Sequence, residues 1–367
     1  AGRQREILAA LAQGCPEVEF IPVTIKTPDE NESALGLRDQ VDGYLVYVAT
    51  LSWALGGTLG AIGKLNKPMV AATEFLGGCG AFLTSAPPLV RGGSAAAVST
   101  TRLEDLVTVA RQFASLRTPG LTPAAFAQQC QQAYRGTFPL ASTGSCADDD
   151  LKLTDIGRCV ERFRKSKVLV LGRGRGGQQQ DVLGATWQYV DWKELQAFYP
   201  EIDPDEAAEQ AARWTRAAQA LPPGQYVEPS VPPAKEIHNA AVVYLATLRL
   251  LKKYDTNMIT MSCGGGLGTS AALCGFPCLG FSQILDDGGL GICEANVDDT
   301  PPMLMALLLA GRPGFVSDPA IDTSQNRIVY SHCVGPTKVF GPSGPQNGYR
   351  IRTSHARVGA VVESLPP

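Results

Sequence analysis

Three short apolar segments near the C-terminus each end in a side chain that can bind a metal ion. Residues 290–294 end in Glu294, residues 314–318 in Asp318 and residues 327–332 in His332. If these segments are strands, two carboxylates and one imidazole lie at strand ends, where loops hold functional groups on a rigid scaffold. Two oxygen donors and one nitrogen donor suit a divalent Mn, Fe, Co or Mg ion better than a closed structural zinc site. The alternative is that Glu294 and Asp318 cap the segments that follow them and that His332 packs in the core.

A glycine-rich loop is the second candidate site. It runs from Gly172 to Gly177, follows a strand-like apolar segment and contains the pattern G-x-G-x-x-G. Asp191 lies after the next strand-like segment, where a dinucleotide-binding domain places the acidic residue that binds the ribose. The three glutamines that follow the loop leave little room for the helix that must receive the pyrophosphate. The loop therefore also fits a tight turn with exposed arginines, or a phosphate contact by Arg173 or Arg175.

The composition excludes several classes of protein. The chain has 367 residues, of which 44% are hydrophobic, so it has ample apolar material to fold and is long enough for two or three domains. Its 32 basic and 35 acidic residues are scattered, which leaves no basic stripe for nucleic acid. The longest uncharged stretch, residues 44–63, is interrupted by polar and glycine residues, which favours a buried strand and a packed helix over a membrane span. We expect neither a nucleic-acid partner nor a membrane partner.

Ten cysteines are spaced irregularly, with no C-x-x-C pair and no partners at zinc-site spacing. Buried thiols explain them best, since cysteine packs as a small hydrophobe. Thiols indicate a reducing compartment, and we therefore predict a cytoplasmic location. A leader removed from the N-terminus stays an alternative.

Apolar runs and helical periodicity predict an α/β fold. In the first third, strands and helices are expected in βαβ order at residues 18–24, 44–48, 53–64, 69–73, 103–116 and 123–134. A second α/β region is expected at residues 167–171, 186–190, 204–220, 234–253 and 258–262, with a glycine-rich turn at 264–268. From residue 281 onward, short apolar runs separated by Gly, Pro and Asp predict strands, with one helix at 301–310. We predict two Rossmann-like parallel-sheet domains, 1–150 and 151–290, and a strand-rich, β-barrel-like and incomplete domain at 291–367.

The candidate metal ligands lie in a longer pattern. This pattern comprises residues 286–298, the helix after them and the two segments that end in Asp318 and His332. It resembles the metal-binding core of the L-fucose isomerase and L-arabinose isomerase superfamily. The resemblance implies that Glu294, Asp318 and His332 hold a divalent metal, usually Mn. His332 lies where the arabinose type has a histidine, whereas the histidine ligand of the fucose type comes far downstream. His355 is the only other late histidine, and it is a candidate for the missing ligand or for a substrate contact.

The resemblance implies a sugar isomerase that interconverts aldose and ketose through an enediol. In the related enzymes the two carboxylates of the metal site act as acid and base, so the catalytic roles would fall on Glu294 and Asp318. A small sugar would be the substrate, and a homo-oligomer is expected. Two alternatives stay open: an NAD(P)-dependent oxidoreductase that uses the glycine-rich loop, and a noncatalytic sugar-binding protein of the same fold. Cys293 and Cys333 flank the expected ligands, and we expect them to be structural because no base is placed to activate a thiol.

Overall fold

The chain forms two compact units. The computed structural model describes residues 2–49, 55–74, 79–139, 149, 151–222, 231–262, 274–354 and 359–365. The first unit comprises Ala1–Cys146 and Ser317–Ser331, and the second comprises Ala147–Val316 and His332–Pro367. The chain therefore passes between the units three times, and residues 317–331 return to the first unit from far along the sequence.

A parallel sheet forms the centre of the first unit. Its strands are β1 (Tyr44–Val48), β2 (Met69–Thr73) and β3 (Ala96–Ser99), in that order. The crossovers contain α3 (Leu55–Gly63) and α4 (Cys79–Arg91), as parallel neighbours require. The predicted βαβ order is confirmed for β1, α3 and β2, whereas α4 and β3 were not predicted.

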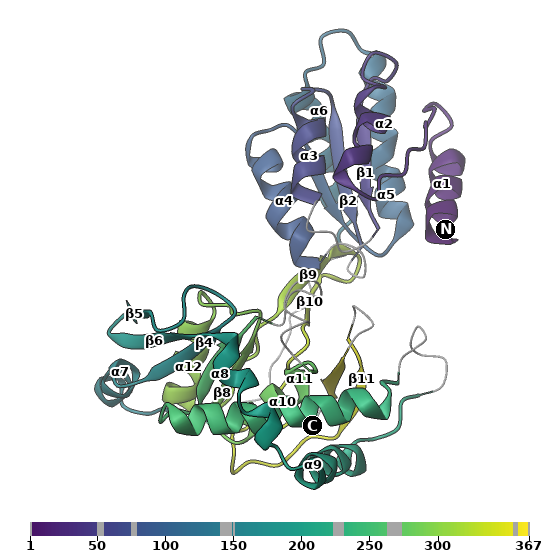
Figure 1. Ribbon diagram of the computed structural model, residues 1–367. Coiled ribbons are helices and arrows are strands. Elements are labelled where there is room, and N and C mark those ends of the chain that lie inside the picture. Colours follow the sequence, from purple (N-terminus) through teal and green to yellow (C-terminus); the bar gives the residue numbers. More distant parts are fainter. Residues whose placement is uncertain are drawn as a thin grey trace. The chain divides into compact units, whose positions relative to one another are not determined.

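Helices cover both faces of this sheet (Figure 1). Val70, Ala72, Ala96 and Val98 pack in one cluster with α1 (Gly2–Gly14), α5 (Leu103–Ala110) and α6 (Pro123–Arg135). Met69 and Ala71 lie in a second cluster with α3 and α4. This division follows from the strand period of two, which sends alternate side chains to opposite faces. The short elements η1 (Pro28–Glu30), α2 (Glu32–Leu35) and η2 (Arg111–Arg117) complete the unit.

Two predicted strands are wrong. Residues 18–24 form no strand, and Pro22 within them lacks the N–H that a sheet ladder needs. Residues 314–317 are also irregular, and Asp318 begins a strand instead of ending one. Pro313 and Gly314 delay the start of this strand, because proline cannot donate to a ladder and glycine weakens a strand.

The returning segment is a hairpin of β9 (Asp318–Asp322), η5 (Thr323–Gln325) and β10 (Arg327–Ser331). Asp322 anchors it: its buried carboxylate accepts hydrogen bonds from Thr101 Oγ1 at 3.1 Å and from Ser324 Oγ at 2.6 Å. Two more contacts link the hairpin to the end of β3 and to α6. Ser99 Oγ donates to the Ile321 carbonyl at 2.5 Å, and the hydroxyl oxygens of Tyr134 and Thr323 are 2.6 Å apart.

The second unit contains a five-stranded sheet in the order β5-β6-β4-β7-β8. Its strands are β4 (Lys167–Leu171), β5 (Gln179–Val182), β6 (Ala185–Val190), β7 (Met258–Met261) and β8 (Leu290–Cys293). All are parallel except β5, which pairs antiparallel with β6. Residues 168–171 of β4 have no exposed surface, so both faces of the sheet are covered.

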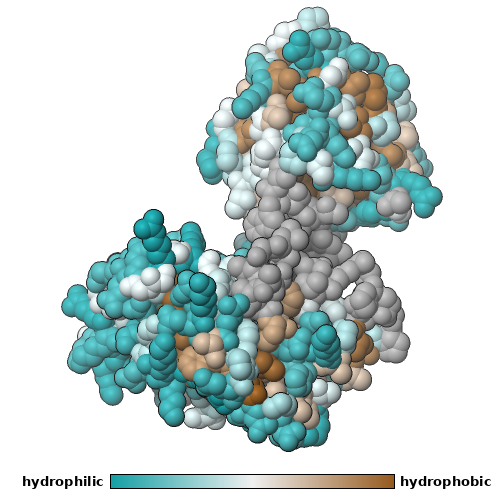
Figure 2. Space-filling model, viewed as in Figure 1, coloured by the Kyte–Doolittle hydropathy of each residue, from teal (hydrophilic) through white to brown (hydrophobic). Residues whose placement is uncertain are grey.

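Helices and a second hairpin surround this sheet. They are α7 (Ile156–Arg164), α8 (Trp192–Gln196), η3 (Tyr199–Glu201), α9 (Pro204–Ala217), α10 (Ala234–Lys253), α11 (Cys278–Asp286), α12 (Thr300–Ala310), and the antiparallel pair β11 (Tyr349–Thr353) and β12 (Ala360–Ser364). Aspartates cap α7, α8 and α9, which explains where these helices begin. Hydrophilic side chains cover most of the face that Figure 2 shows of this unit, and the large apolar side chains gather in one internal core.

The α/β class is confirmed, with parallel strands in both larger sheets. The C-terminal strands are arranged differently from a single barrel. Strand β8 belongs to the five-stranded sheet, the β9–β10 hairpin to the first unit and the β11–β12 hairpin to the second. Across the described ranges, no helix combines the length and apolar character needed to cross a bilayer.

Candidate metal centre

The carboxyl edge of the five-stranded sheet gathers the loops that carry chemistry. From β4 the chain continues to β6 on one side and later to β7 on the other, so the strand order reverses at β4. Ligands of open α/β sheets bind outside the carboxyl ends of the strands at such a point. The glycine-rich loop follows β4, and Glu294 follows β8 at the same edge.

Glu294 lies in a strained turn. Its φ is 67°, and that of Ala295 is 46°, so two consecutive residues with a side chain adopt the left-handed conformation. Such conformations cost about 1–3 kcal/mol each and persist only where the surroundings hold them. Arg173 Nη1 donates to the Ala295 carbonyl at 3.5 Å, and the Asn296 side-chain oxygen accepts from the Asp299 amide at 3.0 Å. These contacts hold the turn that carries the Glu294 carboxylate.

The turn brings Glu294 to His332. The distance from Glu294 Oε1 to His332 Nε2 is 3.9 Å, and the His332 side chain is only 5% exposed whereas that of Glu294 is 35% exposed. Cys293 joins them: its Sγ, a Glu294 carboxylate oxygen and a His332 ring nitrogen all lie within 4.8 Å of one another. All three residues belong to the second unit. The site thus combines a buried imidazole, a buried sulfur and a partly exposed carboxylate.

These donors can reach one ion. An imidazole nitrogen lies about 2.0–2.1 Å from a bound metal and a carboxylate oxygen about 2.0–2.2 Å, so two such atoms that share a metal are at most about 4.3 Å apart. The observed 3.9 Å lies within that limit. His332 Nδ1 is buried and has no hydrogen-bond partner among the described residues. Nδ1 is not the ring nitrogen that approaches Glu294, so the fit of the site to a divalent metal depends on the three donor types and on the distance between His332 Nε2 and Glu294 Oε1.

A buried carboxylate positions the segment after His332. Asp286, at the end of α11, accepts hydrogen bonds from the backbone amides of Thr337 at 2.7 Å and Lys338 at 2.8 Å, and also from the Thr337 hydroxyl. Burial raises the pKa of the Asp286 carboxyl, although these hydrogen bonds oppose the shift. Asp286 therefore links the chain just beyond His332 to a core helix.

Of the residues expected from the sequence, Glu294 and His332 lie together. Asp318 begins β9 in the first unit, where it pairs with Ser331, the residue before His332. Its role as third ligand stays a prediction. His355 lies outside the described residues. From the sequence, Cys293 was expected to be structural, and no local signal places its sulfur beside the Glu294 carboxylate, because neighbouring residues of a strand normally point to opposite faces.

The glycine-rich loop has a structural explanation. Gly172, Gly174 and Gly177 have positive φ values of 79°, 73° and 82°. A Cβ on Gly174 would lie 2.4 Å from the Tyr189 ring, so only glycine fits there. Strand β5 follows the loop, and residues 172–190 contain no helix that could receive a pyrophosphate. Asp191 instead caps α8 by accepting from the Lys193 amide at 2.9 Å. The dinucleotide-binding pattern therefore lacks its essential helix.

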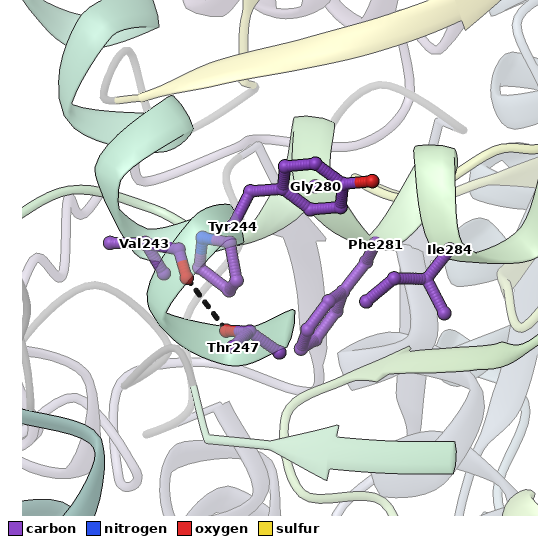
Figure 3. A pocket seen from close by; sticks show the side chains of 7 residues that line it. Val243, Tyr244, Thr247, Gly280, Phe281 and Ile284 are labelled. Carbon is purple, nitrogen blue, oxygen red and sulfur yellow. Dashed lines mark hydrogen bonds between the residues drawn. The ribbon is translucent and has the colours of Figure 1, made fainter. Parts of the chain in front are cut away.

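A hollow between α10 and α11 also fails as a substrate site (Figure 3). It is lined by Val243, Tyr244, Thr247, Pro277, Gly280, Phe281 and Ile284, and it has no room for a water molecule. A Cβ on Gly280 would lie 2.8 Å from Tyr244 Cβ, so glycine permits the close approach of the two helices. The hollow belongs to the interface where α10 and α11 pack together in the core.

No protein-family model matches the chain, and no curated protein matches it significantly. We therefore infer the function from the residues and geometry of this chain.

Proposed function

We propose that the protein is a divalent-metal-dependent sugar isomerase that interconverts aldose and ketose. The observation that carries the proposal is the 3.9 Å approach of the Glu294 carboxylate to the buried His332 ring at the carboxyl edge of a parallel sheet. The sequence resemblance to the L-fucose and L-arabinose isomerase superfamily supplies the reaction class. The same proposal includes manganese as the ion, a homo-oligomer, a cytoplasmic location and a Rossmann-like character of the two units.

The reaction moves a proton between C1 and C2 of the sugar. It needs a base at carbon and stabilisation of the charge that develops on the enediolate. A divalent ion held by Glu294 and His332 would polarise the sugar oxygens and stabilise that charge. Glu294 is exposed enough to reach the substrate, so its carboxylate can take and return the proton. Asp318 is proposed as the second acid–base group, and buried His332 orients the donor set.

Deuterium incorporation tests this proposal. The protein, loaded with Mn²⁺, is incubated in deuterated water with a panel of pentoses and deoxyhexoses, and ketose formation and deuterium at C1 and C2 are measured. We expect turnover with the native chain and none with Glu294→Gln, which should also lose the metal. Asp298→Asn is the matched control, because Asp298 is an exposed acid on the same loop outside the donor group. Full activity of Glu294→Gln would refute the proposal.

A further inference from the structure

We infer that Cys293 is a ligand of the metal and that the site selects a thiophilic divalent ion, zinc or the similar cobalt and ferrous ions, over manganese. The inference rests on the metal site of the proposed function and changes the identity of its ion. Its basis is the group of Cys293, Glu294 and His332, whose donor atoms all lie within 4.8 Å of one another.

The strained turn explains how two consecutive residues can bind the same ion. In a regular strand, the side chains of neighbouring residues point to opposite faces. Cys293 ends β8, where it pairs with Met261 of β7 and is only 2% exposed. Glu294 leaves the extended conformation at once, with φ at 67°. This change of direction returns the carboxylate to the side of the Cys293 sulfur, and strain of this kind is concentrated at functional sites.

The distances between the donor atoms permit a shared ion if one side chain moves slightly. In a tetrahedral site with metal–sulfur distances of about 2.3 Å and metal–nitrogen and metal–oxygen distances of about 2.1 Å, the donor atoms are about 3.4–3.6 Å apart. The nitrogen–oxygen distance of 3.9 Å exceeds this by about half an ångström. Glu294 can make the adjustment because its side chain is partly exposed, whereas the strand and the core hold Cys293 and His332.

The donor chemistry sets the metal preference. Thiolate sulfur is a soft ligand that favours zinc and iron, whereas manganese prefers carboxylate, carbonyl and water oxygens. One sulfur, one nitrogen and one oxygen donor leave a fourth tetrahedral position for water or substrate, as in catalytic zinc sites. The site is therefore suited to bind a zinc-like ion and keep a coordination position for the sugar.

Cobalt spectroscopy tests the inference directly, because a thiolate–cobalt bond produces a charge-transfer absorption in the near ultraviolet. Co²⁺ is titrated into the native protein, Cys293→Ser and Cys333→Ser. Cys333 is the matched control, since it adjoins His332 as Cys293 adjoins Glu294 but lies outside the donor group. We expect the band in the native protein and in Cys333→Ser, its loss in Cys293→Ser, and a zinc affinity at least about tenfold lower in Cys293→Ser with little change for manganese.

The outcomes separate this inference from the proposed function. Cobalt that binds the native protein without a thiolate band overturns the role of Cys293 and leaves the Glu294–His332 site standing; this readout does not require any variant to fold. A thiolate band without isomerisation of any sugar supports Cys293 and refutes the isomerase proposal. Absence of cobalt, zinc and manganese binding refutes both.

Discussion

Asp318 pairs with Ser331 across the β9–β10 hairpin, and Ser331 directly precedes His332. The pairing of the two strands therefore places the backbone of Asp318, one predicted metal ligand, opposite the residue that precedes His332, another predicted ligand. On the same strand, Ala320 and Asp322 are buried against the first unit, whereas Asp318 stays partly exposed. The two aspartates of β9 thus have different environments, and their substitutions should have different effects.

Replacing Asp318 should impair chemistry and leave the fold intact. Asp318 is the proposed second acid–base group, so Asp318→Asn should lower the turnover of the proposed isomerisation by about 10²- to 10⁴-fold. Its free energy of unfolding should stay within about 0.5 kcal/mol of the native value, since a partly exposed residue is replaced by one of equal size. Steady-state kinetics and urea unfolding measure the two effects. Unchanged turnover would remove Asp318 from the proposed site.

Asp322 should make the stability of the first unit pH-dependent. Burial alone would raise the pKa of Asp322, but hydrogen bonds from Ser324 and Thr101 outweigh it and hold the pKa below the ordinary value of 3.8. Because the folded pKa is the lower one, the ionised carboxylate stabilises the fold above about pH 4, and this contribution is lost as the pH falls through the folded pKa. Urea unfolding of the native chain and Asp322→Asn from about pH 5 to about pH 2 should show the two free energies converging. A constant difference between them would contradict this assignment.

Arg173 should act as a positioning residue for the metal site. Its hydrogen bond to the Ala295 carbonyl supports the left-handed turn that carries Glu294. Arg173→Met should therefore weaken cobalt binding by about two- to fivefold, the equivalent of one weak hydrogen bond. Arg175→Met is the control, since Arg175 is an exposed residue of the same loop with the same charge. Equal effects of both substitutions would indicate a general loss of positive charge instead of a lost contact.

The close packing of α10 against α11 predicts that a substitution remote from the metal site lowers the stability of the fold. A side chain at position 280 must displace Tyr244, because the added Cβ would lie 2.8 Å from Tyr244 Cβ. Gly280→Ala should lower the free energy of unfolding by about 1–3 kcal/mol through overpacking. Gly57→Ala in α3 is the matched control: no atom of the described residues lies within 4 Å of its added Cβ, and alanine favours a helix by up to about 1 kcal/mol over glycine. Thermal unfolding that shows Gly280→Ala to be as stable as the native chain would contradict the packing assignment.

Much of the secondary structure could be predicted from the sequence. Strands β1, β2 and β4 and helix α10 have the predicted bounds, because continuous apolar runs and the helical period are local signals. Residues 18–24 were mistaken for a strand because their apolar side chains resemble one, whereas Pro22 leaves the segment without a partner in the ladder.

The candidate site could be predicted only in part from the sequence. Glu294 and His332 could be chosen by residue type, since a carboxylate and an imidazole at strand ends are recognisable metal donors. Cys293 could not be chosen in this way, because the side chains of neighbouring residues in a strand normally point to opposite faces. Only the left-handed turn at Glu294 and Ala295 brings the sulfur and the carboxylate together, and no glycine signals that turn.

The sequence by itself determined many of the helices and strands and the side chains whose chemistry suits a metal. Tertiary structure decided that residues 317–331 belong to the first unit and that Cys293 lies beside His332. The physical reason is that propensity and periodicity act over a few residues, whereas these two arrangements depend on contacts between distant segments. Asp322 with Thr101 and Asp286 with Thr337 are such contacts, and their hydrogen bonds form only when the chain has folded.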